Sequence, residues 1–322
     1  MKVRSALLLL GAGGGVALAM AFAGPASADN GPHVKNSSLV VDNCASCHRM
    51  HSAKASHLLK DPQSQICYSC HGGGGAGATT DVQNGRSYAG GETGLRGGGF
   101  EYALIDAANP VYTPGAGATG TTIGVLAAGT ATNSNHSVDG SSQMAWGNGA
   151  ISATVNYGKS VSLSCGSCHD PHGNGLYRIL RAIPKESGAV SPGVEIADTA
   201  TKVYTTANYW VTQDVNASEF QEKIASWCST CHTRYLADHE AKTDSGDAVY
   251  AYRHTSDSTA VSGKARNCAN CHTAHGSNAS MPGLYSSVVN LPDGTVDTGD
   301  SKLLRINNRG TCRVCHASGY TP

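Results

Sequence analysis

Hydrophobic and polar residues alternate with a regular period in only a few stretches of this chain. Residues 151–163 alternate between apolar and polar positions, which predicts hairpin strands. Residues 217–226 predict a short helix that ends just before Cys228. Other helices should be single turns around the cysteine pairs. We therefore expect a mostly irregular backbone with short helices and a few short strands.

Glycine interrupts the longest interval between cysteines, from residue 72 to residue 161. Four consecutive glycines occupy 72–75, three occupy 97–99, and a Thr/Gly/Ala tract spans 114–135. Runs of glycine do not sustain a helix, so this interval should be loop with short strands. No shift in composition separates two domains. Residues 29–322 are expected to form a single unit.

The apolar run at residues 6–24 has the features of an export signal. Lys2 and Arg4 precede it, and the small residues Ala26, Ser27 and Ala28 follow it as a cleavage site. The alternative is an uncleaved anchor, because the run is about long enough to span a bilayer. Its glycines and the cleavage triplet favour a signal peptide over 1–28. The mature protein should be secreted. It would be extracellular or at the cell surface, or otherwise periplasmic, and it should not insert stably into a membrane.

The composition argues against an ordinary hydrophobic core. The chain has 40 glycines but only three Phe and three Trp among 322 residues, so it has little bulky apolar surface to offset chain entropy. Its 23 basic and 23 acidic residues cancel, which gives no basic patch for nucleic acid and no polybasic lipid anchor. Low net charge permits self-association.

All twelve cysteines belong to six Cys-x-x-Cys-His motifs. These are Cys44-Cys47-His48, Cys67-Cys70-His71, Cys165-Cys168-His169, Cys228-Cys231-His232, Cys268-Cys271-His272 and Cys312-Cys315-His316. The pattern is the attachment signature of c-type haem, in which two thioethers hold the porphyrin and the histidine becomes the proximal ligand. Zinc sites also use Cys-x-x-Cys pairs but do not require the histidine, and disulfides give no reason for it. We predict six haems c per chain, with folding coupled to their attachment.

Eight further histidines could supply the second axial ligands. Three of them, His51, His172 and His275, follow a proximal histidine by three residues. Such a residue cannot easily reach the far face of its own haem, because the porphyrin stands in the way, but it can ligate a neighbouring iron.

Three more histidines complete the six distal ligands that are needed. His136 lies within the longest haem-free interval, His254 lies between the fourth and fifth motifs, and His33 would tether the start of the mature chain. His57 and His239 look like solvated histidines, although either could replace a proposed ligand. Met50, Met144 and Met281 are possible replacements that the supply of histidine makes unnecessary.

Six irons with two histidines each would be closed to substrate, so the chain is expected to be an electron carrier and not an enzyme. Two imidazoles also hold the potential below that of a His/Met pair. The competing enzymatic interpretation is a multihaem reductase of nitrogen or sulfur oxyanions. It requires at least one open iron.

Several segments resemble the doubled-motif regions of secreted multihaem c-type cytochromes. They are Cys165-Gly-Ser-Cys168-His169-Asp-Pro-His172-Gly173 with Tyr177-Arg178-Ile179-Leu180, Trp227-Cys228-Ser-Thr-Cys231-His232-Thr233, Arg253-His254, and Cys268-Ala-Asn-Cys271-His272-Thr-Ala-His275-Gly276-Ser277. Six motifs in this order are similar to the OmcS-like family of hexahaem, filament-forming cytochromes. The resemblance covers most of the mature chain through motif order and neighbouring residues, while the intervals differ in length.

This resemblance implies a backbone wrapped around a continuous chain of six haems, alternately parallel-stacked and T-shaped, in subunits joined head to tail. His51 would ligate a haem of the adjacent subunit, at His272. The distal ligands within one chain would then be His33, His136, His172, His254 and His275. The implied function is a filament subunit that carries electrons between redox partner proteins and extracellular acceptors. The alternative is a monomeric periplasmic shuttle.

Overall fold

The computed structural model describes residues 33, 44–73, 78–88, 93–95, 97–103, 130–149, 158–196, 218–236, 268–279 and 302–305. The expected signal peptide at 1–28, the sixth motif at 312–316, His239 and His254 lie outside this part of the chain.

The described helices are short, and each of the four described α-helices contains at least the first cysteine of a motif. They are α1 (Gln63–His71), α2 (Cys165–Cys168), α3 (Ser218–Cys228) and α4 (Cys268–Cys271), with 3₁₀ turns η2 (Ser56–Leu58) and η3 (Tyr177–Ile179). The first motif forms a turn in which the His48 amide donates to the Cys44 carbonyl at 2.9 Å. The helix expected over 217–226 is confirmed as α3, which begins at Ser218 and continues through Cys228 instead of ending before it.

Within the described residues the strands pair in four small antiparallel sheets. Three two-residue strands, β1 (Thr80–Asp81), β2 (Arg86–Ser87) and β3 (Thr93–Gly94), form one sheet. Two-residue strands also pair as β4 (Tyr102–Ala103) with β5 (Thr130–Ala131), and as β6 (Ser134–Asn135) with β9 (Gly276–Ser277). The longest pair joins β7 (Ser142–Trp146) to β8 (Gly158–Ser162), with Met144 opposite Ser160. Of the hairpin strands expected in 151–163, residues 151–157 lie outside the described part of the chain, and β8 meets the expectation for the rest; it pairs with β7, which precedes that range.

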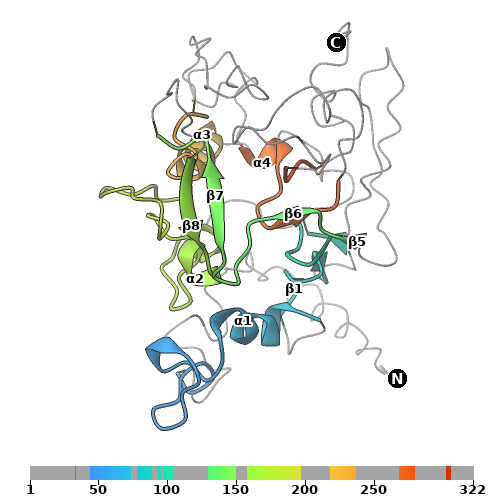
Figure 1. Ribbon diagram of the computed structural model, residues 1–322, viewed down its shortest axis with the longest axis vertical. Helices are drawn as coiled ribbons and strands as arrows, with labels where there is room; N and C mark the ends of the chain where they lie inside the picture. Colours follow the sequence, from blue (N-terminus) through green and yellow to red (C-terminus); the bar gives the residue numbers. More distant parts are fainter. Residues whose placement is uncertain are drawn as a thin grey trace, which may run out of the picture.

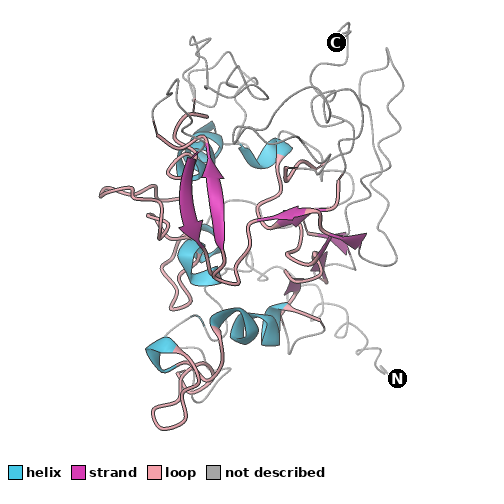
Figure 2. Ribbon diagram, viewed as in Figure 1, coloured by secondary structure: helices cyan, strands magenta, loops and turns pink. Residues whose placement is uncertain are grey.

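The five described motifs follow one another in space in the order of the chain. In Figure 1 the segment 44–61 projects at the bottom, α1 and α2 lie above it, and α3 and α4 lie at the far end of the β7–β8 hairpin. Helix α1 contacts α2, and α3 contacts α4. Loops join most of these elements (Figure 2). The expected irregular fold is confirmed in this respect.

Buried hydrophobic residues are few in the described part of the chain. One cluster joins Tyr177, Ile196 and Ile224, and Trp227 packs against it. The Trp227 indole donates from Nε1 to the Arg181 carbonyl at 2.7 Å, which satisfies its polar end. This cluster lies between the third motif and α3, so it fixes the third and fourth motifs relative to each other. None of the described helices is long and apolar enough to span a membrane.

Candidate functional site

Each proximal histidine of the five described motifs donates its Nδ1 proton to a backbone carbonyl. The pairs are His48 with His57 (2.9 Å), His71 with Thr80 (3.2 Å), His169 with Arg178 (2.9 Å), His232 with Trp146 (2.6 Å) and His272 with Lys302 (3.0 Å). A carbonyl only accepts, so the proton lies on Nδ1 and the Nε2 lone pair is left for a metal. This is the usual arrangement behind a metal-bound imidazole.

Burial keeps several of these imidazoles neutral. Desolvation lowers the pKa of His71 and of His169, and it lowers the pKa of His232 and of His272 to about 4. The pKa of His275 falls to about 3 for the same reason, with the nearby His169 adding to the shift. The neutral ring is the form that binds a metal.

Four proximal rings face a second histidine ring at nearly the same distance. The centroids are 6.3 Å apart for His48 and His172, 6.2 Å for His71 and His33, 6.5 Å for His169 and His275, and 6.3 Å for His232 and His136. An imidazole nitrogen binds a metal at about 2.0 Å and the ring centre lies about 1.1 Å behind it, so two rings on one metal have centroids about 6.2 Å apart. The four pairs therefore fit an iron held between two imidazoles.

The pairs follow a rule along the chain. His172, which follows the third motif, faces the proximal histidine of the first motif, and His275, which follows the fifth, faces that of the third. A histidine three residues past one motif thus lies beside the motif two places earlier. The structure brings together eight of the twelve histidines that the sequence nominated, and their ligation of iron stays a prediction.

His33 and His136 occupy equivalent places beside the second and fourth motifs. The Nδ1 of His33 donates to the Pro171 carbonyl and that of His136 to the Ala274 carbonyl, each at 2.8 Å. Both acceptors immediately precede another predicted distal ligand, His172 or His275. Neighbouring predicted ligands are therefore held side by side, and for His136 the β6–β9 pairing supplies the register.

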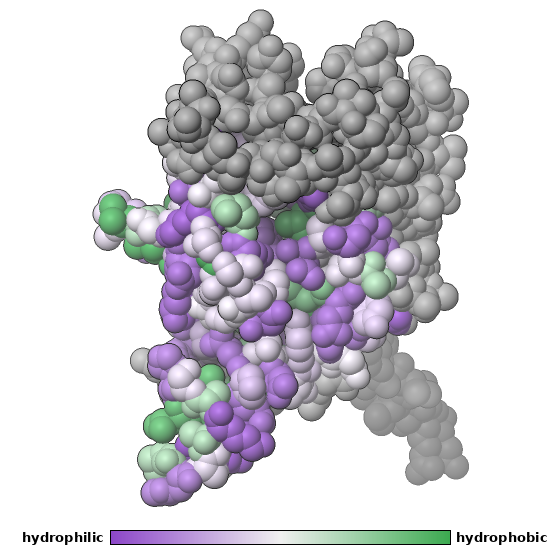
Figure 3. Space-filling model, in the orientation of Figure 1, coloured by the Kyte–Doolittle hydropathy of each residue, from purple (hydrophilic) through white to green (hydrophobic). Residues whose placement is uncertain are grey.

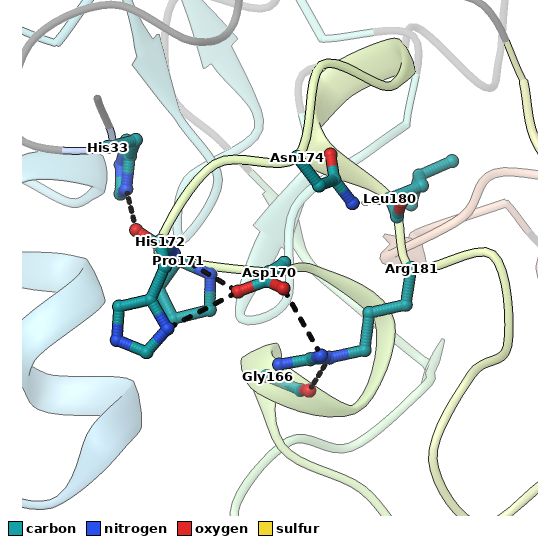
Figure 4. Close-up of polar contacts among 8 residues, drawn as sticks. All are labelled: His33, Gly166, Asp170, Pro171, His172, Asn174, Leu180 and Arg181. Atoms are coloured by element: carbon teal, nitrogen blue, oxygen red, sulfur yellow. Dashed lines mark hydrogen bonds and ion pairs between the residues drawn. The ribbon is translucent and has the colours of Figure 1, made fainter. Parts of the chain in front are cut away.

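Asp170 orients His172, as Figure 4 shows. Its Oδ1 accepts from the His172 backbone amide at 3.1 Å and lies 3.5 Å from His172 Nδ1. The other oxygen lies 3.4 Å from Nη1 of Arg181, whose Nε donates to the Gly166 carbonyl at 2.8 Å. This carboxylate was not predicted from the sequence, although its place between His169 and His172 could have indicated it.

Aromatic rings pack against two of the paired histidines. The Phe100 ring centroid lies 4.7 Å from that of His275, at 31°. The Tyr235 ring is nearly parallel to that of His232, with centroids 6.0 Å apart. These contacts restrict the rotation of both imidazoles.

Cysteines of successive motifs also meet. The Cys67 thiol hydrogen-bonds with Cys165, and Cys228 does so with Cys268, which raises the pKa of Cys67 and of Cys228. Each contact joins the first cysteine of an even-numbered motif to that of the next odd-numbered motif. The attachment edges of adjacent motifs are therefore in contact.

Three described histidines remain outside the pairs: His51, His57 and the proximal His272. His51 and His57 are both exposed, and His57 contributes only its carbonyl, to His48. Within the described residues no histidine ring faces His51 or His272. The same part of the chain contains no cluster of three or more metal-binding side chains. Cys312, Cys315, His316 and His254 lie outside it.

Comparison with known proteins gives one match, which covers residues 37–76 and the first two motifs: the family described as the doubled CXXCH motif. No curated protein and no solved structure matches the chain. The CXXCH motifs indicate covalently bound c-type haem, and the match supports a multihaem c-type cytochrome. Such proteins are typically electron carriers.

Proposed function

We propose that this chain is a hexahaem c-type cytochrome that conducts electrons as one subunit of an extracellular filament. The observation that carries the proposal is the set of four histidine pairs, each with the spacing that one iron requires. Bound haem supplies a one-electron couple, and the chain supplies two imidazoles for each iron. Such irons leave no position for a substrate.

The contacts between motifs support conduction along the chain. Cys67 meets Cys165 and Cys228 meets Cys268, so the attachment edges of the second and third haems, and of the fourth and fifth, would be adjacent. The first and second haems would be held together through the contact of His33 with the residue before His172. The third and fourth would be joined in the same way through His136.

The pairing rule supports assembly from head to tail. The first motif takes its partner from the segment after the third, and the third takes its partner from the segment after the fifth. By the same rule the fifth motif needs a histidine from a following unit. His51 of a second copy has the right place in its motif, so it would ligate the iron at His272 of the first copy.

The surface around His51 fits such a contact. Met50 is 79% exposed and Leu58 is 51% exposed. In Figure 3 hydrophobic residues gather on this projecting segment. Burying these side chains against a second copy would favour association. Met50 also precedes His51 as Pro171 precedes His172. Its carbonyl would therefore accept a hydrogen bond from the distal histidine of the preceding even-numbered motif, which is the sixth motif of the first copy.

The sixth haem would be attached to Cys312 and Cys315, with His316 and His254 as its ligands. The expected signal peptide would bring the chain outside the cytoplasmic membrane. There the filament would pass electrons between redox partner proteins and extracellular acceptors.

Two other functions make different demands on the same residues. A monomeric periplasmic shuttle would close the fifth iron within one chain, with His57 or His239 replacing His51. A reductase of nitrogen or sulfur oxyanions would need an open iron. The four histidine pairs argue against that for the first four motifs.

His51→Ala in the secreted holoprotein, with His57→Ala as the matched control, tests the proposal. Both side chains are exposed and lie in the same projecting segment. We expect electron micrographs to show filaments for the unaltered protein and the control, and only monodisperse particles for His51→Ala. The His51→Ala protein should also contain one high-spin haem. Monodisperse unaltered protein would support the shuttle, and filaments of His51→Ala would refute the bridging ligand.

A further inference from the structure

Three four-residue segments of this chain share an unusual backbone conformation. They occupy 57–60, 178–181 and 302–305, and we call each of them a strap. In each strap the first two residues are left-handed: φ is 60° and 59° in the first, 49° and 51° in the second, and 45° and 62° in the third.

None of these six left-handed residues is glycine. Leu58, Ile179 and Leu303 carry bulky side chains in a region that such residues rarely occupy, and Ile179 is β-branched. Conformations of this kind cost about 1–3 kcal/mol and persist where the surrounding structure requires them. Three independent occurrences at matching places indicate a requirement that the three sites share.

Each strap makes the same three hydrogen bonds to an odd-numbered motif. Its first carbonyl accepts from Nδ1 of the proximal histidine, its second carbonyl accepts from the amide after that histidine, and its fourth amide donates to the carbonyl of the second cysteine. The distances in that order are 2.9, 2.8 and 2.9 Å at His48, 2.9, 2.8 and 2.8 Å at His169, and 3.0, 2.7 and 3.0 Å at His272.

The left-handed pair explains how one strap can accept twice on the same side. In an extended strand successive carbonyls point in opposite directions, whereas two consecutive residues in a helical conformation, of either hand, point theirs the same way. The first carbonyl can therefore reach the imidazole while the second reaches the adjacent amide. The ring is fixed relative to its own backbone.

The second and fourth motifs use different acceptors. His71 donates to Thr80 in β1, and His232 donates to Trp146 in β7. Neither acceptor lies in a left-handed pair. The strap thus separates the first, third and fifth motifs from the second and fourth.

We propose that the straps position the proximal imidazoles of the first, third and fifth haems and keep the potentials of these haems low. The inference rests on the proposed haem ligation. A carbonyl that accepts the Nδ1 proton fixes the tautomer and ring plane, and it makes the imidazole a stronger donor to iron. Stronger donation favours ferric iron, so loss of the bond raises the potential.

His57→Pro tests the first strap, with His57→Gly as its control. Proline fixes φ near −65°, which removes the left-handed conformation, whereas glycine retains it without strain. Both variants lose the His57 side chain, so only the backbone differs between them. We expect spectroelectrochemical titration of the His57→Pro holoprotein to show one of six haems shifted to higher potential. His57→Gly should leave all six potentials unchanged and keep or raise the unfolding midpoint.

The proposal is overturned if the two variants have equal titration curves, whether neither variant shifts a haem potential or both shift it by the same amount. Haem content is measured first, because a chain without haem would refute the proposed function and not the strap. If His57→Pro does not fold, ¹⁵N-histidine NMR of the reduced, unaltered holoprotein is the second measurement. It should show Nδ1 protons of the proximal histidines protected from exchange with solvent, and rapid exchange would contradict the strap.

Discussion

The rings of His48 and His172 lie 6.3 Å apart, centroid to centroid, although one belongs to the first motif and the other follows the third. Three further pairs repeat this distance within 0.2 Å, from 6.2 to 6.5 Å. Ordinary aromatic contacts vary much more widely. The recurrence indicates that the backbone is built to hold two imidazoles at the separation of one metal ion.

His172→Ala should leave the first haem with a single axial imidazole. We expect a high-spin ferric signal from one of six haems in the electron paramagnetic resonance (EPR) spectrum, because alanine offers no ligand. His57→Ala is the control, since the His57 ring faces no other ring within the described residues and its carbonyl is retained. An entirely low-spin His172→Ala protein would mean that another residue ligates this iron.

Asp170→Ala should weaken the same site without removing its ligand. The carboxylate accepts from the His172 amide and lies beside its Nδ1, so its loss frees the ring to rotate. We expect a smaller high-spin fraction than in His172→Ala, and a higher potential for the first haem. Asp170→Asn keeps an acceptor but loses the charge. It should remain low-spin while its potential still rises, and identical spectra for the Ala and Asn variants would count against this role.

Gly98→Ala should destabilise the fold around His275. Gly98 has φ +69°, its carbonyl accepts from His275 Nδ1 at 3.3 Å, and an added Cβ would collide with the Gly276 carbonyl oxygen. We expect the free energy of unfolding to fall by about 2–4 kcal/mol, which combines about 1 kcal/mol for the left-handed conformation with about 1–3 kcal/mol for overpacking. Thermal unfolding of the holoprotein measures it.

Gly140→Ala is the matched control for this substitution. Gly140 also has positive φ, at +82°, but its added Cβ would meet nothing within 4 Å. The Gly140→Ala variant should therefore lose only about 1 kcal/mol of its free energy of unfolding. Equal losses for the two variants would show that the approach of Gly98 to Gly276 contributes nothing.

A haem-free version with all cysteines changed to serine should not fold cooperatively. The described part of the chain has a buried cluster of only Tyr177, Ile196 and Ile224, with partly buried neighbours. That area is small against the entropy of ordering the backbone. Circular dichroism during heating should show no cooperative transition. A sharp transition would show that the chain folds without haem, and would contradict the predicted coupling of folding to haem attachment.

The sequence predicted the chemistry of this site better than its geometry. Residue types and spacing identify the proximal histidines, and the three-residue spacing singles out His172 and His275. Which proximal histidine each one faces depends on packing between distant segments, such as β6 against β9. Spacing along the chain carries no information about such contacts.

The acceptor carbonyls were not predicted because every residue has one. A signal does exist, since each strap reads basic, aliphatic, leucine, basic: His57-Leu58-Leu59-Lys60, Arg178-Ile179-Leu180-Arg181 and Lys302-Leu303-Leu304-Arg305. The strap lies nine residues from its histidine at the first and third motifs but 30 at the fifth. The variable spacing hides the repeat from a search at fixed period.

The EPR spectrum of the fully oxidised, assembled holoprotein shows whether any iron is open. With haem content determined on the same sample, we expect six haems per chain, all low-spin, because every iron would lie between two imidazoles. A high-spin ferric signal equal to one or more haems per chain in the assembled protein would contradict this expectation. That result would mean that at least one iron is open, and it would support the alternative function as a reductase of nitrogen or sulfur oxyanions.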